Sequence, residues 1–103
     1  MLAKPLKLSD GSFDQCNVEE ATHIMLNTPG PIPTRIIPLS GRPSWTWNKS
    51  TKSPTLSPSL LTDTEDKSGK IRCHSFVRNG QIQFLNDCTH EFAGTTMPLL
   101  PVD

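Results

Sequence analysis

Alternating apolar and polar positions dominate the second half of the chain and predict β-strands. Residues 45–48 alternate two indoles with polar side chains, and we expect both indoles to pack in the core. Residues 54–61 alternate too, with Leu56 and Leu60 on one face and hydroxyl groups on the other. Because Pro58 has no N–H to donate to a ladder, this strand should lie at a sheet edge or bulge at the proline.

The clearest local prediction is a hairpin that turns at the dipeptide Asn79-Gly80. The turn joins residues 71–78 to residues 81–88, and both runs are rich in strand-forming side chains. Asn-Gly between two such runs favours a tight type I′ turn. The chain then closes with residues 97–101, which predict a short edge strand or a packed tail.

A two-residue turn determines which side chains of the hairpin share a face. Ser75 then faces Phe84 and Val77 faces Ile82, and this face is apolar enough to belong to the core. A slip of one residue would exchange the two faces, so every inference about the outward side chains depends on this register.

The outward face of the hairpin carries a histidine and an aspartate within reach of each other. In the predicted register His74 and Asp87 are diagonal cross-strand neighbours. One interpretation is that Asp87 pairs with Arg72, directly opposite, and that His74 is an ordinary surface residue. The other is that Asp87 orients His74 as a general base.

A nucleophile for such a base would come from the preceding strand, which carries hydroxyl groups on one face. If that strand pairs beside residues 72–77, a seryl oxygen approaches His74. Serine, histidine and aspartate form a catalytic triad by geometry rather than by chain order, so Ser59 is the predicted nucleophile and Ser57 the second choice. His90 is the alternative base. Serines in strands are also commonly plain polar-face residues, and that interpretation stays open.

Prolines shape the N-terminal part of the chain. Four of the ten prolines fall within residues 28–41, which excludes a long helix there and predicts extended or irregular chain. Residues 14–26 predict one short helix that Asn17 could cap. Further along, residues 63–69 are polar and predict a loop.

Together these patterns predict a mainly β protein, a single domain over residues 1–103. We expect a small antiparallel sheet or barrel, with the motif-bearing β core in residues 44–97. Residues 1–43 should form a Pro-rich irregular segment with at most one short helix. A chain of 103 residues can bury one modest core.

Charge and composition narrow the classes of partner. Ten acidic and ten basic residues give a formal net charge of zero, without the basic surplus of a nucleic-acid or anionic-membrane binder. The first residues lack the apolar run of a secretory signal, and no segment has membrane-spanning length. Three cysteines in such a chain are expected to be reduced, which predicts a cytoplasmic protein.

The cysteines and histidines supply a second site hypothesis. Cys73-His74 and Cys88-Thr89-His90 lie near each other across the predicted hairpin, and Cys16 and His23 could join them in a tetrahedral zinc site. No Cys-x-x-Cys pair occurs, however, and on the core face Cys73 and Cys88 also fit the role of small hydrophobic residues. Serine chemistry would require no cofactor, whereas structural zinc is the competing interpretation.

The motif-bearing half of the chain resembles a known family. The matching segments are residues 45–48, 54–59, 73–76, 79–80, 87–90 and 93–94. The combination resembles a family of small bacterial and phage proteins that are often mislabelled as ammonia monooxygenase and otherwise described as a domain of unknown function. Its members often begin with a Cys-x-x-Cys…His arrangement. Here Cys16 and His23 match its ends, while Glu19 stands in place of the second cysteine.

The resemblance implies a function. Similar members occur beside bacterial genes for ubiquitin-like proteins and for their activating and conjugating enzymes, which form antiviral conjugation systems. This context implies a deubiquitinase-like serine peptidase, with Ser59, His74 and Asp87 as its triad and a ubiquitin-like protein or its conjugates as partner. The alternative is a non-catalytic, zinc-stabilised binding or adaptor module, for example a phage anti-defence protein. A metallopeptidase is a third reading.

Overall fold

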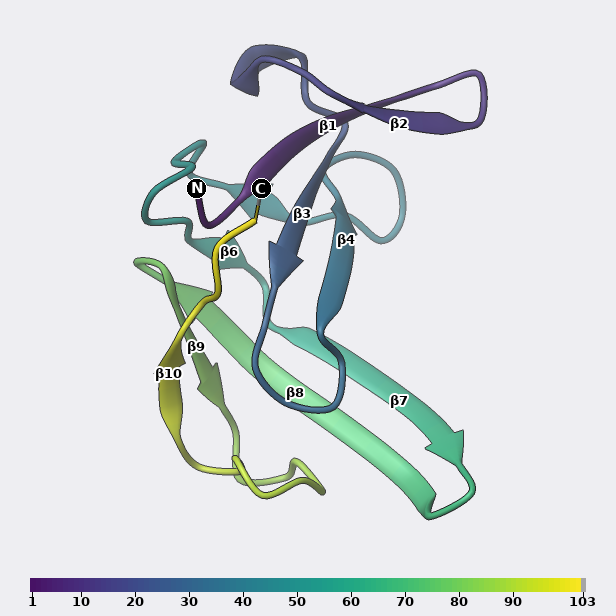
Figure 1. Ribbon diagram of the computed structural model, residues 1–103, viewed down its shortest axis with the longest axis vertical. Helices are drawn as coiled ribbons and strands as arrows, with labels where there is room; N and C mark the ends of the chain where they lie inside the picture. The colour runs from purple at the N-terminus through teal and green to yellow at the C-terminus, as the bar shows by residue number, and fades with distance from the viewer. Residues whose placement is uncertain (103) are drawn as a thin grey trace.

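The computed structural model describes residues 1–102 and confirms a mainly β chain (Figure 1). One 3₁₀ turn, Val18–Glu20, is the helical element of this part of the chain. The strands in chain order are β1 (Lys4–Ser9), β2 (Ser12–Gln15), β3 (His23–Asn27), β4 (Thr34–Pro38), β5 (Thr46–Trp47), β6 (Leu56–Ser57), β7 (Leu60–Asp66), β8 (Gly69–Arg78), β9 (Gln81–Phe84) and β10 (Thr96–Pro98).

The strands form two four-stranded antiparallel sheets and a two-stranded ribbon. The first sheet has the order β2-β1-β3-β4, the second has the order β10-β9-β8-β7, and β5 pairs with β6. Strands β4 and β7 therefore each end a sheet, and in Figure 1 the lower end of β4 approaches β7. The C-terminal segment joins the sheets, because Leu99 N–H donates to Gly80 O and Leu100 N–H donates to Asn27 O.

The core lies where the two sheets face each other. Each sheet contributes alternate positions of its strands, as the period of two in a strand requires. Ile24 and Leu26 of β3 are fully buried, and so is Ile82 of β9, while Val77 and Phe84 are 1% exposed. The ribbon adds Trp47 to the same cluster, as expected for that indole.

The predicted hairpin register is confirmed as far as Phe84, whereas the predicted pairing of Arg72 directly opposite Asp87 is not formed. Ser75 pairs with Phe84 and Val77 with Ile82, and Asn79 and Gly80 both adopt positive φ values, as a type I′ turn requires. The ladder ends at Phe84, earlier than predicted. Beyond this point the chain still follows β8 through separate hydrogen bonds, since Leu85 N–H donates to His74 O and Thr89 N–H donates to Arg72 O.

The prediction of a short helix over residues 14–26 is wrong. Only Val18–Glu20 forms a 3₁₀ turn, and Asn17 makes no side-chain hydrogen bond that caps it. The second half of the segment is β3, where Ile24 and Leu26 are buried between half-buried neighbours. This alternation is a strand pattern, and pairing with β1 and β4 on both sides overrides the weak helical signal.

Residues 1–43 are also more regular than the prolines indicated, because they form the whole first sheet. Proline is tolerated here for positional reasons: the β1–β2 ladder begins only at Leu6, after Pro5, and Pro38 is the last residue of the edge strand β4. The polar residues 63–69 likewise form strand rather than loop as far as Asp66. Opposite charges face each other across that ladder, with Asp63 against Arg72.

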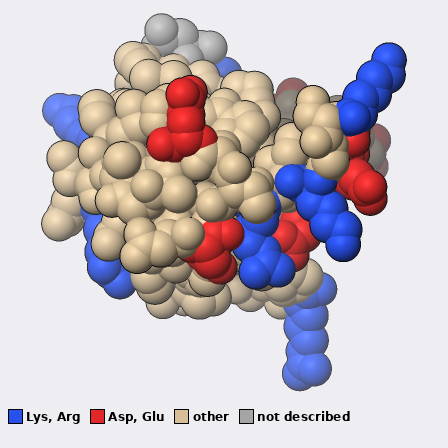
Figure 2. Space-filling view, turned by 90° about the horizontal axis from the view of Figure 1, so that it is seen from below, with Lys and Arg blue, Asp and Glu red and all other residues tan. Residues whose placement is uncertain are grey.

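Charged side chains of both signs are interspersed on the face that Figure 2 shows, and much of that face carries neither sign. This distribution agrees with the formal net charge of zero. Within residues 1–102, none of the helical structure is long or apolar enough to cross a membrane.

Two adjacent leucines of β7 provide a test of the register. Leu60 is 4% exposed and packs in the core, whereas Leu61 is 53% exposed on the outward face. We predict that Leu60→Ala lowers the free energy of unfolding by about 2–4 kcal/mol, because it leaves a cavity. Leu61→Ala should change it by no more than about 0.5 kcal/mol. Urea titration measures both values, and equal losses would contradict the described register.

Candidate active site

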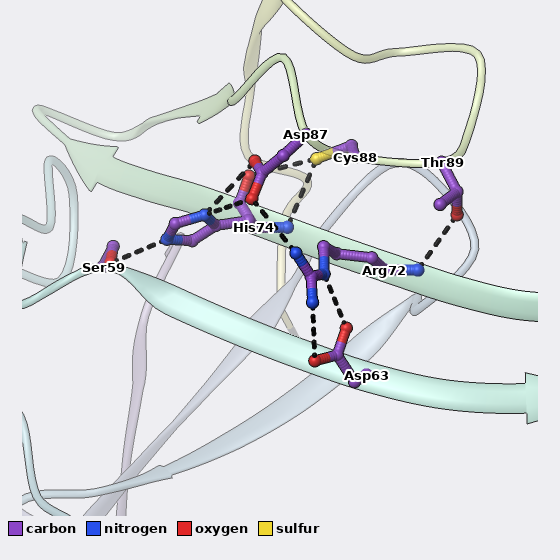
Figure 3. A network of polar contacts seen from close by, with 7 residues as sticks. All are labelled: Ser59, Asp63, Arg72, His74, Asp87, Cys88 and Thr89. Carbon is purple, nitrogen blue, oxygen red and sulfur yellow. Dashed lines mark hydrogen bonds and ion pairs between the residues drawn. The ribbon is translucent and has the colours of Figure 1, made fainter.

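A serine, a histidine and an aspartate form a chain of contacts on the outward face of the second sheet (Figure 3). Ser59 Oγ lies 3.1 Å from His74 Nε2. The other ring nitrogen, Nδ1, lies 3.0 Å from Asp87 Oδ2 and 3.3 Å from Oδ1. The structure therefore brings together the three side chains of the predicted triad.

His74 occupies a firm position because β8 is an internal strand of its sheet. Strand β7 flanks it on one side, where Leu61 is its pairing partner. On the other side lies the chain that continues from β9, held by the bond from Leu85 N–H to His74 O. The neighbours Cys73 and Ser75 point into the core, so the pleat turns His74 outward, where 24% of its side chain is exposed.

Ser59 lies between β6 and β7, immediately after the prolyl residue that separates them. The buried side chains of Leu56 and Leu60 hold the chain on both sides of this break. Trp45 also fixes the position, because its indole N–H donates to the Ser59 carbonyl at 3.1 Å. Sequence reasoning assigned Trp45 only a packing role. Its half-buried ring packs against the core while its N–H finds a hydrogen-bond partner, as is usual for an indole.

Asp87 is positioned by the residue that follows it. The buried Cys88 accepts a hydrogen bond from His74 N–H at its sulfur, at 3.2 Å, and its thiol donates to His74 O at 3.1 Å. These contacts fasten the turn after β9 to the peptide groups of His74. Thr89 adds a further tie, since its hydroxyl accepts from Arg72 N–H at 2.9 Å.

The two interpretations of Asp87 can now be compared by distance. Its carboxylate is 3.0 Å from His74 but 3.7 Å from Arg72 Nη1. The guanidinium is instead turned to Asp63, with 2.9 Å between Nε and Oδ1. Arg72 therefore bridges two carboxylates, and the short contact of Asp87 is with the imidazole, as Figure 3 shows.

The pKa shift of Asp87 agrees with the assignment of His74 as its main partner. The hydrogen bond from His74 lowers the pKa of the Asp87 carboxyl below its usual value, and the charge of Arg72 adds to the effect. An ionised Asp87 favours the neutral tautomer of His74 that carries its proton on Nδ1, because Nδ1–H can donate to the carboxylate. In that tautomer Nε2 has a free lone pair. That lone pair faces the Ser59 hydroxyl, so the arrangement can accept a proton from the serine as its oxygen attacks a carbonyl carbon.

The second-choice residues lie elsewhere. Ser57 is exposed on β6 and pairs with Thr46 of the ribbon. His90 packs edge-on against Phe84, with 4.8 Å between ring centroids, and its Nδ1 accepts from Phe92 N–H. Desolvation lowers the pKa of His90, and the charge of Arg35 lowers it further.

The trio predicted for zinc is not assembled. Cys16 follows β2 and His23 begins β3, both in the first sheet, while the sulfur of Cys88 is turned to the main chain of His74. His23 bonds the Thr22 hydroxyl at 2.9 Å and packs against Phe13. Within residues 1–102, no three His, Cys, Asp or Glu side chains are grouped to hold a metal ion.

Comparison with protein families supplies an independent observation. Residues 9–85, more than half of the chain, match the family model described as bacterial ubiquitination-like system serine protease (BubE). The chain belongs to this family. The matched segment contains Ser59 and His74, and Asp87 lies just beyond its end. The expected link to bacterial ubiquitin-like systems is thus confirmed at the level of the family. A comparison with curated proteins found no match, and neither did one with solved structures.

The titration of Asp87 tests the histidine–carboxylate contact. A carboxyl whose pKa is lowered on folding adds stability above its unfolded pKa, and this contribution is lost as pH falls through the folded value. We predict that His74→Ala moves the Asp87 midpoint upward toward its ordinary value, because it removes the hydrogen bond that is the largest cause of the shift. Carboxyl carbon shifts followed by NMR between neutral and strongly acidic pH measure it. An unchanged midpoint would assign the shift to Arg72 instead.

Proposed function

We propose that this protein is a serine peptidase that cleaves the bond after the C-terminal residue of a bacterial ubiquitin-like protein. It would mature the precursor of that protein, or release it from targets to which it has been attached. The observation that carries this proposal is the contact chain from Ser59 through both nitrogens of His74 to Asp87. Membership of a family of serine proteases from ubiquitination-like systems supports both the chemistry and the class of substrate.

Each residue would have a distinct role in the reaction. Ser59 Oγ attacks the scissile carbonyl while His74 Nε2 takes its proton. The imidazolium then protonates the leaving amine as the C–N bond breaks, which leaves an ester on Ser59. Water attacks this ester with the help of His74, which releases the acid and restores the serine. Asp87 holds the ring in the productive tautomer and stabilises its positive charge.

The tetrahedral intermediate needs hydrogen-bond donors for its oxyanion, and we expect backbone N–H groups around Pro58 to supply them. No metal ion or organic cofactor takes part in these steps. The side chain of Asp87 is 45% exposed, so the site is open to solvent on this face. An entering substrate would displace water from it.

Two serines in one short segment give a matched pair of variants. We predict that Ser59→Ala lowers kcat/KM by at least about 10³-fold on a ubiquitin-like protein fused at its C-terminus to a reporter. Ser57→Ala should retain activity, because its hydroxyl does not reach His74. Asp87→Ala should lower kcat/KM by about 10²–10⁴-fold. Cleavage is followed by gel electrophoresis and mass spectrometry of the new C-terminus.

Two results would count against this function. Full cleavage by the double Ser57→Ala, Ser59→Ala variant would exclude serine chemistry. Tight binding of the ubiquitin-like protein by the folded wild-type protein, without any cleavage of precursor or conjugate, would indicate a non-catalytic binding module instead. Circular dichroism of each variant shows whether lost activity reflects lost folding.

A further inference from the structure

A groove runs between the edge strands of the two sheets, and its lining begins at Leu60, the residue after Ser59. It has a volume of about 390 Å³, within the range of ligand sites. Its walls are largely apolar: β4 contributes Ile36 and Pro38, and β7 contributes Leu60 and Leu61. Trp45 also lines the groove, and its backbone N–H donates to Pro38 O at 3.0 Å. We refer to this feature as the β4–β7 groove.

Both walls of the β4–β7 groove are free strand edges. Strand β4 pairs only with β3, and β7 only with β8, among the described strands. Exposed edges invite another strand, and proteins usually protect them with charge. The outer part of β7 carries such charges in Asp63 and Glu65, but residues 60–62, which line the groove, carry none. This stretch is thus open to pairing with an extended peptide.

Large apolar side chains are exposed on both sides of the groove. Ile36 of the first sheet is 43% exposed and Leu61 of the second is 53% exposed. They come from different sheets yet face one cavity, so burying them would require a single occupant with apolar side chains of its own.

A buried positive charge lies at the floor of the groove. Arg35 is 8% exposed, and its guanidinium donates to Thr62 Oγ1 at 3.3 Å and to Cys73 Sγ at 2.8 Å. Within residues 1–102 no carboxylate lies within ion-pair distance of it, and its Nε–H has no hydrogen-bond partner. An uncompensated buried cation favours an occupant that offers oxygen atoms and disfavours one that carries a lysine there.

Three residues that line the groove are direct neighbours of the proposed reacting groups. Leu60 and Leu61 directly follow Ser59, and Leu61 is the cross-strand partner of His74. Trp45 belongs to both places, because it lines the groove and its indole holds the Ser59 carbonyl. A peptide lying along β7 would therefore bring one of its carbonyl groups to the serine hydroxyl.

From these features we infer that the β4–β7 groove binds the C-terminal tail of the ubiquitin-like substrate as an added strand. The tail would place apolar side chains between Ile36 and Leu61 and an acidic or uncharged residue over Arg35. This inference rests on the proposed function, since it assigns to the same site the segment of substrate that precedes the scissile bond.

Kinetics of groove variants test the assignment. Ile36→Gln changes a wall that makes no contact with the triad, and Leu8→Gln is its control, an equally exposed residue of the β1–β2 hairpin. We predict that Ile36→Gln lowers kcat/KM on the reporter fusion by about 10-fold or more, mainly through KM. The rate at which a small fluorophosphonate labels Ser59 should stay unchanged in both variants.

The outcomes separate this inference from the proposed function. If the wild-type protein cleaves the fusion and Ile36→Gln behaves like Leu8→Gln, the groove is not the tail site although the peptidase assignment stands. If the wild-type protein cleaves neither fusion nor conjugate, the proposed function fails first. Slower fluorophosphonate labelling of Ile36→Gln would show that this wall supports the triad rather than the tail, and it would overturn the assignment of the groove.

Direct binding gives a second readout that needs no catalysis. The Ser59→Ala protein, labelled with ¹⁵N, is titrated with a synthetic peptide of about eight residues, a usual strand length, copied from the C-terminus of the ubiquitin-like protein. Shifts should concentrate at Ile36 and Leu61 and spare Leu8. Each tail position is then replaced in turn by Lys and by Glu. At the position that lies over Arg35, Lys should weaken binding and Glu should not. A second cavity, of about 590 Å³, is lined by Asp63, Arg72 and Asp87, and shifts confined to it would overturn the proposal.

Discussion

The turn at Asn79-Gly80 determines which side chains of the second sheet point into the core and which point outward, and the site depends on this alternation. Two central residues with positive φ fix the register of β8 against β9, which sends alternate side chains of β8 inward and His74 outward. The pairing of β7 with β8 extends this alternation to β7, so the Ser59 hydroxyl lies on the outward face as well. The serine–histidine–aspartate contacts are thus assembled by strand pairing rather than by a buried polar core.

Around this register the molecule separates packing from chemistry. The inward face of β8 is filled by buried side chains that belong to the common core, and the outward face carries an open network of charges. Arg72 joins the carboxylates of Asp63 and Asp87, and it limits the freedom of the latter without occupying its short contact with His74. Exposed ion pairs of this kind contribute little to stability, so their value lies in orientation.

Sequence patterns predicted local features well and long-range ones poorly. The hairpin could be predicted because its turn residues and its alternation lie within one short stretch. The strand β3 could not, since Ile24 and Leu26 read as strand only once β1 and β4 flank them. The choice of Ser59 over Ser57 depends on where the chain breaks near Pro58. Arg35 gave no sequence signal, because its burial arises from the meeting of two sheets.

The contact between the Cys88 thiol and His74 affects how thiol-directed inhibitors would act on this protein. The thiol is buried against the peptide group of His74, to which it is bonded in both directions. Alkylation or oxidation of this atom would add bulk directly behind the imidazole and displace it. In the proposed serine peptidase, sensitivity to a thiol-blocking reagent would therefore come from Cys88 and not from the nucleophile, and inhibitor profiling alone would assign the wrong mechanistic class.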